Sequence, residues 1–61
     1  MTIATEDKLK CAERELKMRE RVYPRWVENG KLSAAKAAKE MAAMKAIYED
    51  YLYAVGKERL P

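Results

Sequence analysis

The sequence contains no histidine or phenylalanine, and it has only one cysteine, one serine and two glycines. Without histidine, the commonest general base and activator of a nucleophilic side chain is missing, and two glycines provide no glycine-rich phosphate loop. The single Cys11 excludes an internal disulfide and, with no histidine beside it, argues against a structural zinc site. We therefore expect a non-enzymatic protein with no cofactor and no metal, in which Cys11 is structural.

Long apolar runs are also missing, which argues against a membrane-spanning segment. Hydrophobic residues make up 49% of the chain, too many for a disordered tail. Thirteen basic residues against ten acidic ones give a net charge of +3, a bias too small to indicate nucleic-acid binding by itself. The first residues lack the pattern of a secretory signal, so we expect a cytoplasmic protein with no membrane partner.

The chain is short for an independently stable fold. A domain of 61 residues hides only about 60% of the surface that its unfolded chain exposes. Small folds usually compensate with disulfides, a metal or oligomerisation, and the first two are excluded or disfavoured here. We therefore expect a homo-oligomer, with dimer and tetramer both open.

A first amphipathic helix is predicted over residues 5–28, with the hydroxyl of Thr5 as its N-terminal cap. Its packing face has three- and four-residue spacing and comprises Leu9, Ala12, Leu16, Arg19, Tyr23 and Trp26, widened by Cys11, Met18 and Val22. Pairs with the acid four residues before the base are Glu6–Lys10, Glu13–Lys17 and Glu15–Arg19. Such pairs stabilise the exposed side of a helix.

Pro24 interrupts the pattern, because it has no N–H and its ring crowds the carbonyl of Glu20. Either the helix bends at Pro24 and continues to Glu28, or it ends near Val22 and a separate turn follows. Whether the helix bends or ends here decides whether Trp26 faces the core or a binding site. In both, residues 29–32, which begin with Asn-Gly, form the turn.

A second helix is predicted over residues 33–55, with Ser33 as its cap, Gly56 as its end, and a short basic tail over residues 56–61 that contains Lys57, Arg59 and Pro61. Its packing residues keep a heptad-like spacing: Ala34, Ala37, Met41, Met44, Tyr48, Tyr51 and Val55. The short turn makes the helices antiparallel neighbours. The expected fold is an all-α antiparallel helical hairpin that assembles into a helical bundle. The expected oligomer or partner seam comprises Leu9, Leu16, Met41, Met44, Tyr48, Tyr51 and Val55.

The most distinctive segment lies over residues 19–26, where arginines and aromatic residues concentrate. Arginine offers a planar set of donors for phosphate or carboxylate and stacks on aromatic rings. The candidate ligand- or partner-binding residues are Arg19, Arg21, Tyr23, Arg25 and Trp26. A competing and commoner interpretation makes Tyr23 and Trp26 core residues and the arginines an ordinary charged flank.

The segment Arg14-Glu15-Leu16-Lys17-Met18-Arg19-Glu20-Arg21-Val22-Tyr23-Pro24-Arg25-Trp26-Val27, followed by Gly30-Lys31 and by Met44-Lys45-Ala46-Ile47, resembles a group of small phage and prophage proteins. Those proteins share a REL-x-MR-x-RVYPRWV…GK segment and an M-x-A-I element in a second helix. The resemblance spans roughly residues 12–47. It implies a phage accessory factor inside a bacterial cell, acting in host takeover or counter-defence.

Three functions follow from these features. The first is a homo-oligomeric binding protein that sequesters a small anionic nucleotide or occupies a host protein. The second is a structural or regulatory adaptor whose methionine-rich seam, with Met41 and Met44, docks a partner helix. The third and weakest is non-specific nucleic-acid binding. Sequence-specific DNA binding is not expected, because a helix-turn-helix needs a third helix for which the chain has no room.

Overall fold

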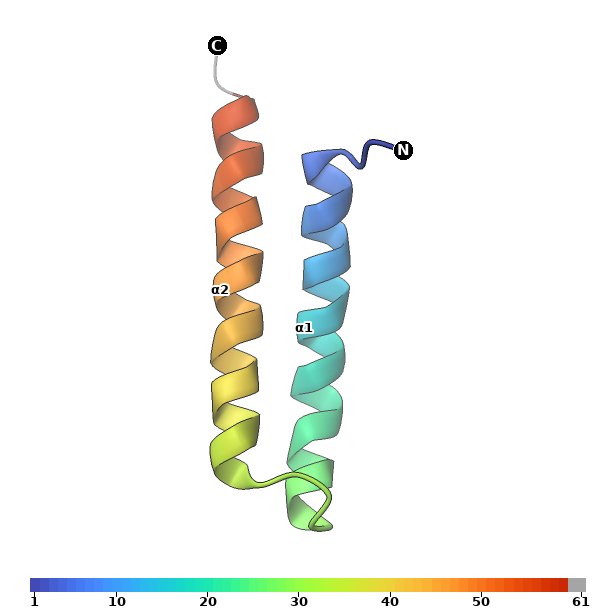
Figure 1. Cartoon of the computed structure of the whole chain (residues 1–61), viewed down its shortest axis with the longest axis vertical. Coiled ribbons are helices and arrows are strands. Elements are labelled where there is room, and N and C mark those ends of the chain that lie inside the picture. The colour runs from blue at the N-terminus through green and yellow to red at the C-terminus, as the bar shows by residue number, and fades with distance from the viewer. Residues whose placement is uncertain (60–61) are drawn as a thin grey trace.

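The protein is a pair of antiparallel α-helices, as the computed structural model in Figure 1 shows for residues 1–59, the part of the chain that the structure describes. Helix α1 spans Thr5–Glu28 and helix α2 spans Ala34–Glu58. The hairpin measures 48 × 21 × 17 Å, and the start of α1 and the end of α2 lie at the end opposite the connection. The predicted all-α helical hairpin is confirmed.

Helix α1 begins without the predicted side-chain cap. Ala4 is the N-cap residue, and its carbonyl oxygen accepts hydrogen bonds from the backbone N–H groups of Asp7 and Lys8 at 3.0 and 3.1 Å. The prediction that Thr5 caps the helix is wrong. Thr5 is the first helical residue, and its hydroxyl instead donates to Glu58 Oε1 at 2.8 Å, across the open end of the hairpin.

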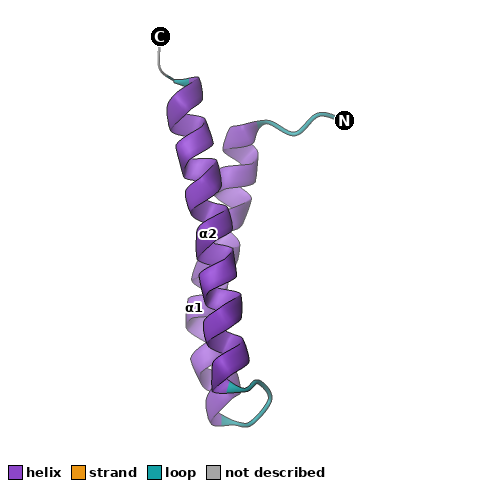
Figure 2. Ribbon diagram, turned by 60° about the vertical axis from the view of Figure 1, so that its left-hand side comes forward, coloured by secondary structure: helices purple, strands orange, loops and turns teal. Residues whose placement is uncertain are grey.

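Pro24 does not end helix α1, which runs unbroken past it to Glu28 (Figure 2). The alternative of a helix ending near Val22 is therefore wrong. Since proline has no N–H, the carbonyl oxygen of Glu20 loses its usual donor from four residues further along the chain. A bend at this point stays a prediction.

The turn after α1 forms as predicted at Asn29-Gly30. Asn29 is the C-cap residue, and Gly30 has a φ of 80°, in the left-handed region that favours glycine. The N–H of Gly30 donates to the Val27 carbonyl at 3.2 Å, and the N–H of Lys31 donates to the Trp26 carbonyl at 2.9 Å. These two bonds form a Schellman motif, which satisfies carbonyl groups at the helix end.

Helix α2 begins with the predicted serine cap. The backbone N–H of Lys36 donates to Ser33 Oγ at 3.1 Å, and that of Ala37 donates to the Ser33 carbonyl at 2.9 Å. The hydroxyl thus satisfies an N–H group that lacks a partner within the helix. The predicted cap is confirmed.

The predicted end of α2 at Gly56 is wrong, because the helix continues to Glu58. Among the described residues, only Gly30 has the positive φ that ends a helix, so Gly56 keeps a right-handed conformation. The longer helix brings Glu58 to Thr5 and Arg59 to Glu6, where Arg59 Nη2 lies 2.8 Å from Glu6 Oε1. These contacts use residues that were predicted to form a short basic tail. Pro61 lies outside the described residues.

Side-chain ion pairs follow the predictions in part. Glu13–Lys17 and Glu15–Arg19 form at 3.0 and 2.9 Å. Glu6 pairs with Arg59 instead of Lys10, because α2 extends far enough to reach it. One predicted pair is thus replaced by a contact between the helices.

The core between the helices is thin. Four residues of the described chain are buried, with 5–8% of their surface exposed: Ala12, Ala37, Met44 and Val55. The other predicted seam residues are half-buried beside them, namely Leu9, Leu16, Met41, Tyr48 and Tyr51, whereas Ala34 is exposed. Met44 and Val55 therefore belong to the interface within one chain, and a partner would meet the half-buried members of the seam.

Candidate functional site

Arg19 is a bridge between the two helices. Its Nε donates to Glu15 Oε1 at 2.9 Å, and its Nη1 donates to the backbone carbonyl oxygen of Glu40 at 3.0 Å. The guanidinium carbon lies 5.7 Å from the centroid of the Tyr23 ring, and only 20% of the side chain is exposed. The hydrogen bond that Arg19 donates to Glu15 raises the pKa of Arg19 above its ordinary value. The main role of Arg19 is therefore structural, because its side chain connects the two helices.

Tyr23 and Trp26 contact each other on the same side of α1. Their ring centroids are 5.6 Å apart and the rings are tilted by 33°. Tyr23 is half-buried near the second helix, whereas Trp26 is 37% exposed. Trp26 is therefore a surface residue whose ring contacts Tyr23. Trp26 was predicted to lie on the packing face of α1, and Val27 lies there instead.

Arg21 and Arg25 are fully available to solvent. Both are exposed, and within residues 1–59 neither side chain forms a hydrogen bond or ion pair. A spacing of four residues places them one turn apart on the same side of α1. Val22 and Trp26 form a second row with the same spacing beside them. We refer to these four residues as the arginine–tryptophan edge.

The structure therefore divides the five predicted binding residues into two groups. Arg19 and Tyr23 face the second helix, and Arg21, Arg25 and Trp26 belong to the exposed edge. Val22 was assigned only to the packing face by the sequence analysis. Its four-residue spacing from Trp26 was the signal that it also borders the edge.

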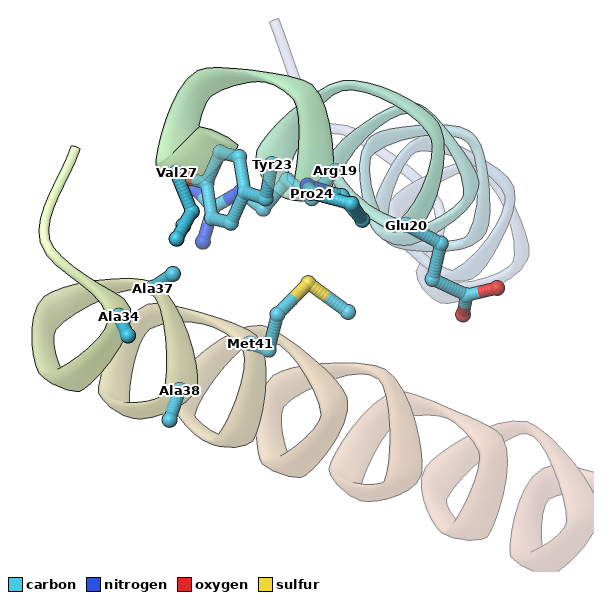
Figure 3. A pocket seen from close by; sticks show the side chains of 9 residues that line it. All are labelled: Arg19, Glu20, Tyr23, Pro24, Val27, Ala34, Ala37, Ala38 and Met41. Atoms are coloured by element: carbon cyan, nitrogen blue, oxygen red, sulfur yellow. The ribbon is translucent and has the colours of Figure 1, made fainter. Parts of the chain in front are cut away.

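An apolar groove of about 410 Å³ lies between the helices near the turn (Figure 3). Val27 points from α1 toward the alanines of α2, the Tyr23 ring lies along α1, and the Met41 thioether rises between the helices. The lining residues are Arg19, Glu20, Tyr23, Pro24, Val27, Ala34, Ala37, Ala38 and Met41. The sequence analysis placed Met41 in the seam but missed the groove, which exists because alanines leave space opposite larger side chains.

A second groove of about 390 Å³ lies at the open end of the hairpin. Ile3, Cys11 and Ile47 contribute apolar surface to it, and Asp7, Lys8 and Glu15 bring charge. Cys11 is an exposed free thiol there. Both grooves are therefore mainly apolar with a few charged residues at their edges.

Within residues 1–59, no cluster of three or more acidic or cysteine side chains is arranged to hold a metal ion. Across the same residues, neither helix combines the length and apolar character needed to cross a membrane. The chain matches no protein-family model, no curated protein and no solved structure. A functional proposal therefore depends on the surfaces described above.

Proposed function

We propose that this chain is a non-enzymatic accessory binding protein that recognises an anionic partner through its arginine–tryptophan edge. One observation carries the proposal: Arg21 and Arg25 are exposed one helical turn apart, without partners in residues 1–59, beside a Trp26 that is 37% exposed. The partner is a small nucleotide-like anion or an acidic surface of a host protein.

The chemistry of the edge supports this class of partner. Each guanidinium offers two parallel N–H donors to a phosphate or carboxylate, and the neighbouring indole offers an apolar stacking surface. Tyr23 contacts the indole, and Arg19 in turn contacts Tyr23 and bonds to the second helix. The edge is thus supported from behind by a connected set of side chains, which limits the entropy lost on binding.

The biological setting in this proposal comes from the resemblance to small phage and prophage proteins. A protein of this size with no histidine and no phosphate-binding loop acts stoichiometrically, by occupying its target, more readily than by catalysis. We propose a host-takeover or counter-defence role on that basis.

Trp26 is the only tryptophan, so its fluorescence reports directly on the edge. We would titrate the protein with mononucleotides, dinucleotides and pyrophosphate, and pass a bacterial lysate over the immobilised chain. Arg21→Glu and Arg25→Glu should each abolish binding while helicity is kept. Arg14→Glu, the same charge reversal at an exposed position two turns earlier, is the matched control and should retain it. If binding survives both Arg21→Glu and Arg25→Glu, the arginine–tryptophan edge does not bind the anion.

A second candidate function is a helical adaptor, and the apolar groove favours it. Met41 lies in this groove, and its flexible side chain can adapt to the side chains of a partner helix that would fill the groove. For an adaptor, Met41→Glu would abolish partner binding and the arginine reversals would leave it intact. Non-specific nucleic-acid binding, the weakest candidate, would instead show a steep loss of affinity with salt.

A further inference from the structure

The hairpin exposes more surface than a folded chain of its mass normally does. Its accessible surface is 4969 Å². The general scaling of surface with mass gives about 4,100 Å² for a 7.1 kDa protein. The excess is about 900 Å², close to the roughly 800 Å² that each partner contributes to a standard protein interface. The single hairpin therefore exposes about as much extra surface as one partner buries in a standard protein interface.

The hairpin leaves apolar surface uncovered on both of its sides. The groove near the turn and the groove at the open end use different sides of both helices, as the helical period of their lining residues shows. On the side of the groove near the turn, apolar residues continue along the whole hairpin. We call this set the apolar face: Leu9, Leu16, Val27, Met41, Tyr48 and Leu52.

The members of the apolar face are left incompletely covered by the hairpin. Leu52 is 49% exposed, and the other five are half-buried. Leu9 and Leu16 are seven residues apart on α1, as are Met41 and Tyr48 on α2, which is the spacing of a seam that packs against further helices. A helix pair laid on this face would complete the burial of all six side chains.

The opposite side of the hairpin carries charged groups that already have partners, beside the apolar residues of the second groove. Glu15 accepts a hydrogen bond from Arg19, and Glu58 accepts one from Thr5. Covering these groups would remove them from water at a cost that their exposed bonds do not offset. Two charged residues, Arg19 and Glu20, line the groove on the apolar face, against three, Asp7, Lys8 and Glu15, in the groove on the opposite side. We therefore take the apolar face as the side that an interface covers.

We propose that the apolar face is covered by a second copy of this chain, so that two hairpins form a four-helix bundle. The missing area matches one standard interface, and a self-complementary patch is the requirement of a twofold dimer. Charge at the margins agrees for one pair, because α1 carries Glu20 there and α2 carries Lys45, whereas Glu13 is already paired with Lys17 at 3.0 Å. When α1 of one copy lies over α2 of the other, opposite charges meet.

This dimer is independent of the proposed anion-binding function. Arg21 and Arg25 lie on the outer side of α1 by the helical period, away from the apolar face. Dimerisation therefore leaves the arginine–tryptophan edge exposed on each copy. It does occupy the groove that the adaptor function would need.

The test is the native mass of the full chain by light scattering, together with its thermal midpoint over a hundredfold range of concentration. We expect a mass of about 14 kDa, twice that of the 7.1 kDa chain, and a midpoint that rises with concentration. A monomer at every concentration, with a constant midpoint, would overturn the proposal and leave the apolar face to a foreign helix.

Two variants of α2 locate the interface. Leu52→Glu changes a residue of the apolar face that is 49% exposed in the single hairpin, and Ile47→Glu makes the same change at a 44% exposed residue on the opposite side. We expect Leu52→Glu to give a helical monomer and Ile47→Glu to remain dimeric. The reverse result, or a dimer in both variants, would show that the apolar face is not the interface. If Leu52→Glu fails to fold, the concentration dependence of the wild-type midpoint still decides whether the dimer exists.

Discussion

Arg19 donates a hydrogen bond across the hairpin to the backbone carbonyl oxygen of Glu40, with 3.0 Å between Nη1 and the oxygen. The bond joins the middle of α1 to α2, and a second bond to Glu15 holds the guanidinium in place. Arg19 belongs by sequence to the same arginine-rich segment as Arg21 and Arg25. The fold separates it from them, because its side chain alone reaches the second helix.

The first prediction concerns this bridge. Arg19→Ala should lower the free energy of unfolding by roughly 1–2 kcal/mol, since a hydrogen bond from a charged donor between the two helices is lost. Urea denaturation followed by circular dichroism measures the change. Arg21→Ala removes an exposed arginine two positions away and should alter stability by less than about 0.5 kcal/mol. Equal effects at the two positions would show that the bridge contributes nothing.

The contribution of the bridge should not depend on pH near neutrality. The pKa of Arg19 is raised in the folded protein by its hydrogen bond with Glu15. A raised pKa gives stability that is complete below the unfolded-state value and is lost only as pH rises through the folded-state value, which for arginine lies far above neutrality. The difference between wild type and Arg19→Ala should therefore be the same at pH 6 and pH 9. A difference that shrinks toward pH 9 would contradict this assignment.

The two glycines should respond to alanine in opposite directions. Gly56 lies inside α2 with open space around an added Cβ, so Gly56→Ala should stabilise the protein by about 0.5–1 kcal/mol. Gly30 also has open space but a φ of 80°, so Gly30→Ala should destabilise it by roughly 1 kcal/mol. Thermal unfolding of both variants checks the pair. Loss of stability in Gly56→Ala would mean that Gly56 ends the helix in solution.

Removing the hydroxyl of Ser33 or of Thr5, at the starts of the two helices, should lower stability by different amounts in thermal unfolding. Ser33→Ala removes the cap bond to Lys36 and should cost about 1 kcal/mol. Thr5→Ala removes an exposed hydrogen bond to Glu58 and no cap, so its effect should stay below about 0.5 kcal/mol. A larger loss at Thr5 than at Ser33 would restore Thr5 as a cap.

Pro24 is the last residue for which we predict a clear sign. Because α1 continues past it, Pro24→Ala restores an N–H that can donate to the Glu20 carbonyl and should stabilise the helix by about 1–2 kcal/mol. The matched control is Ala42→Pro, which places proline at an exposed interior position of α2 and should cost roughly 3 kcal/mol. Denaturant titration distinguishes the two. A destabilised Pro24→Ala would indicate that the ring contributes packing at the groove which outweighs the missing bond.

Several features that depend on neighbouring residues were predicted correctly from the sequence. The helix periods, the Ser33 cap and the turn at Gly30 each involve contacts within a few positions, and each is present. Two of the errors, at Thr5 and Gly56, have a shared cause. The Thr5 hydroxyl has a partner 53 residues away, and the helix continues through Gly56 to the residues that contact the start of α1.

The sequence by itself determined that the chain forms two amphipathic helices and where the turn between them falls, because helix period, capping and glycine conformation are local properties. Only the tertiary structure decided how the arginine-rich segment is divided. Arg19 bonds to Glu40, Trp26 lies on the surface, and Val27 takes the place predicted for it. Those outcomes depend on the distance and rotation between two packed helices, which the spacing of residues along one helix does not specify.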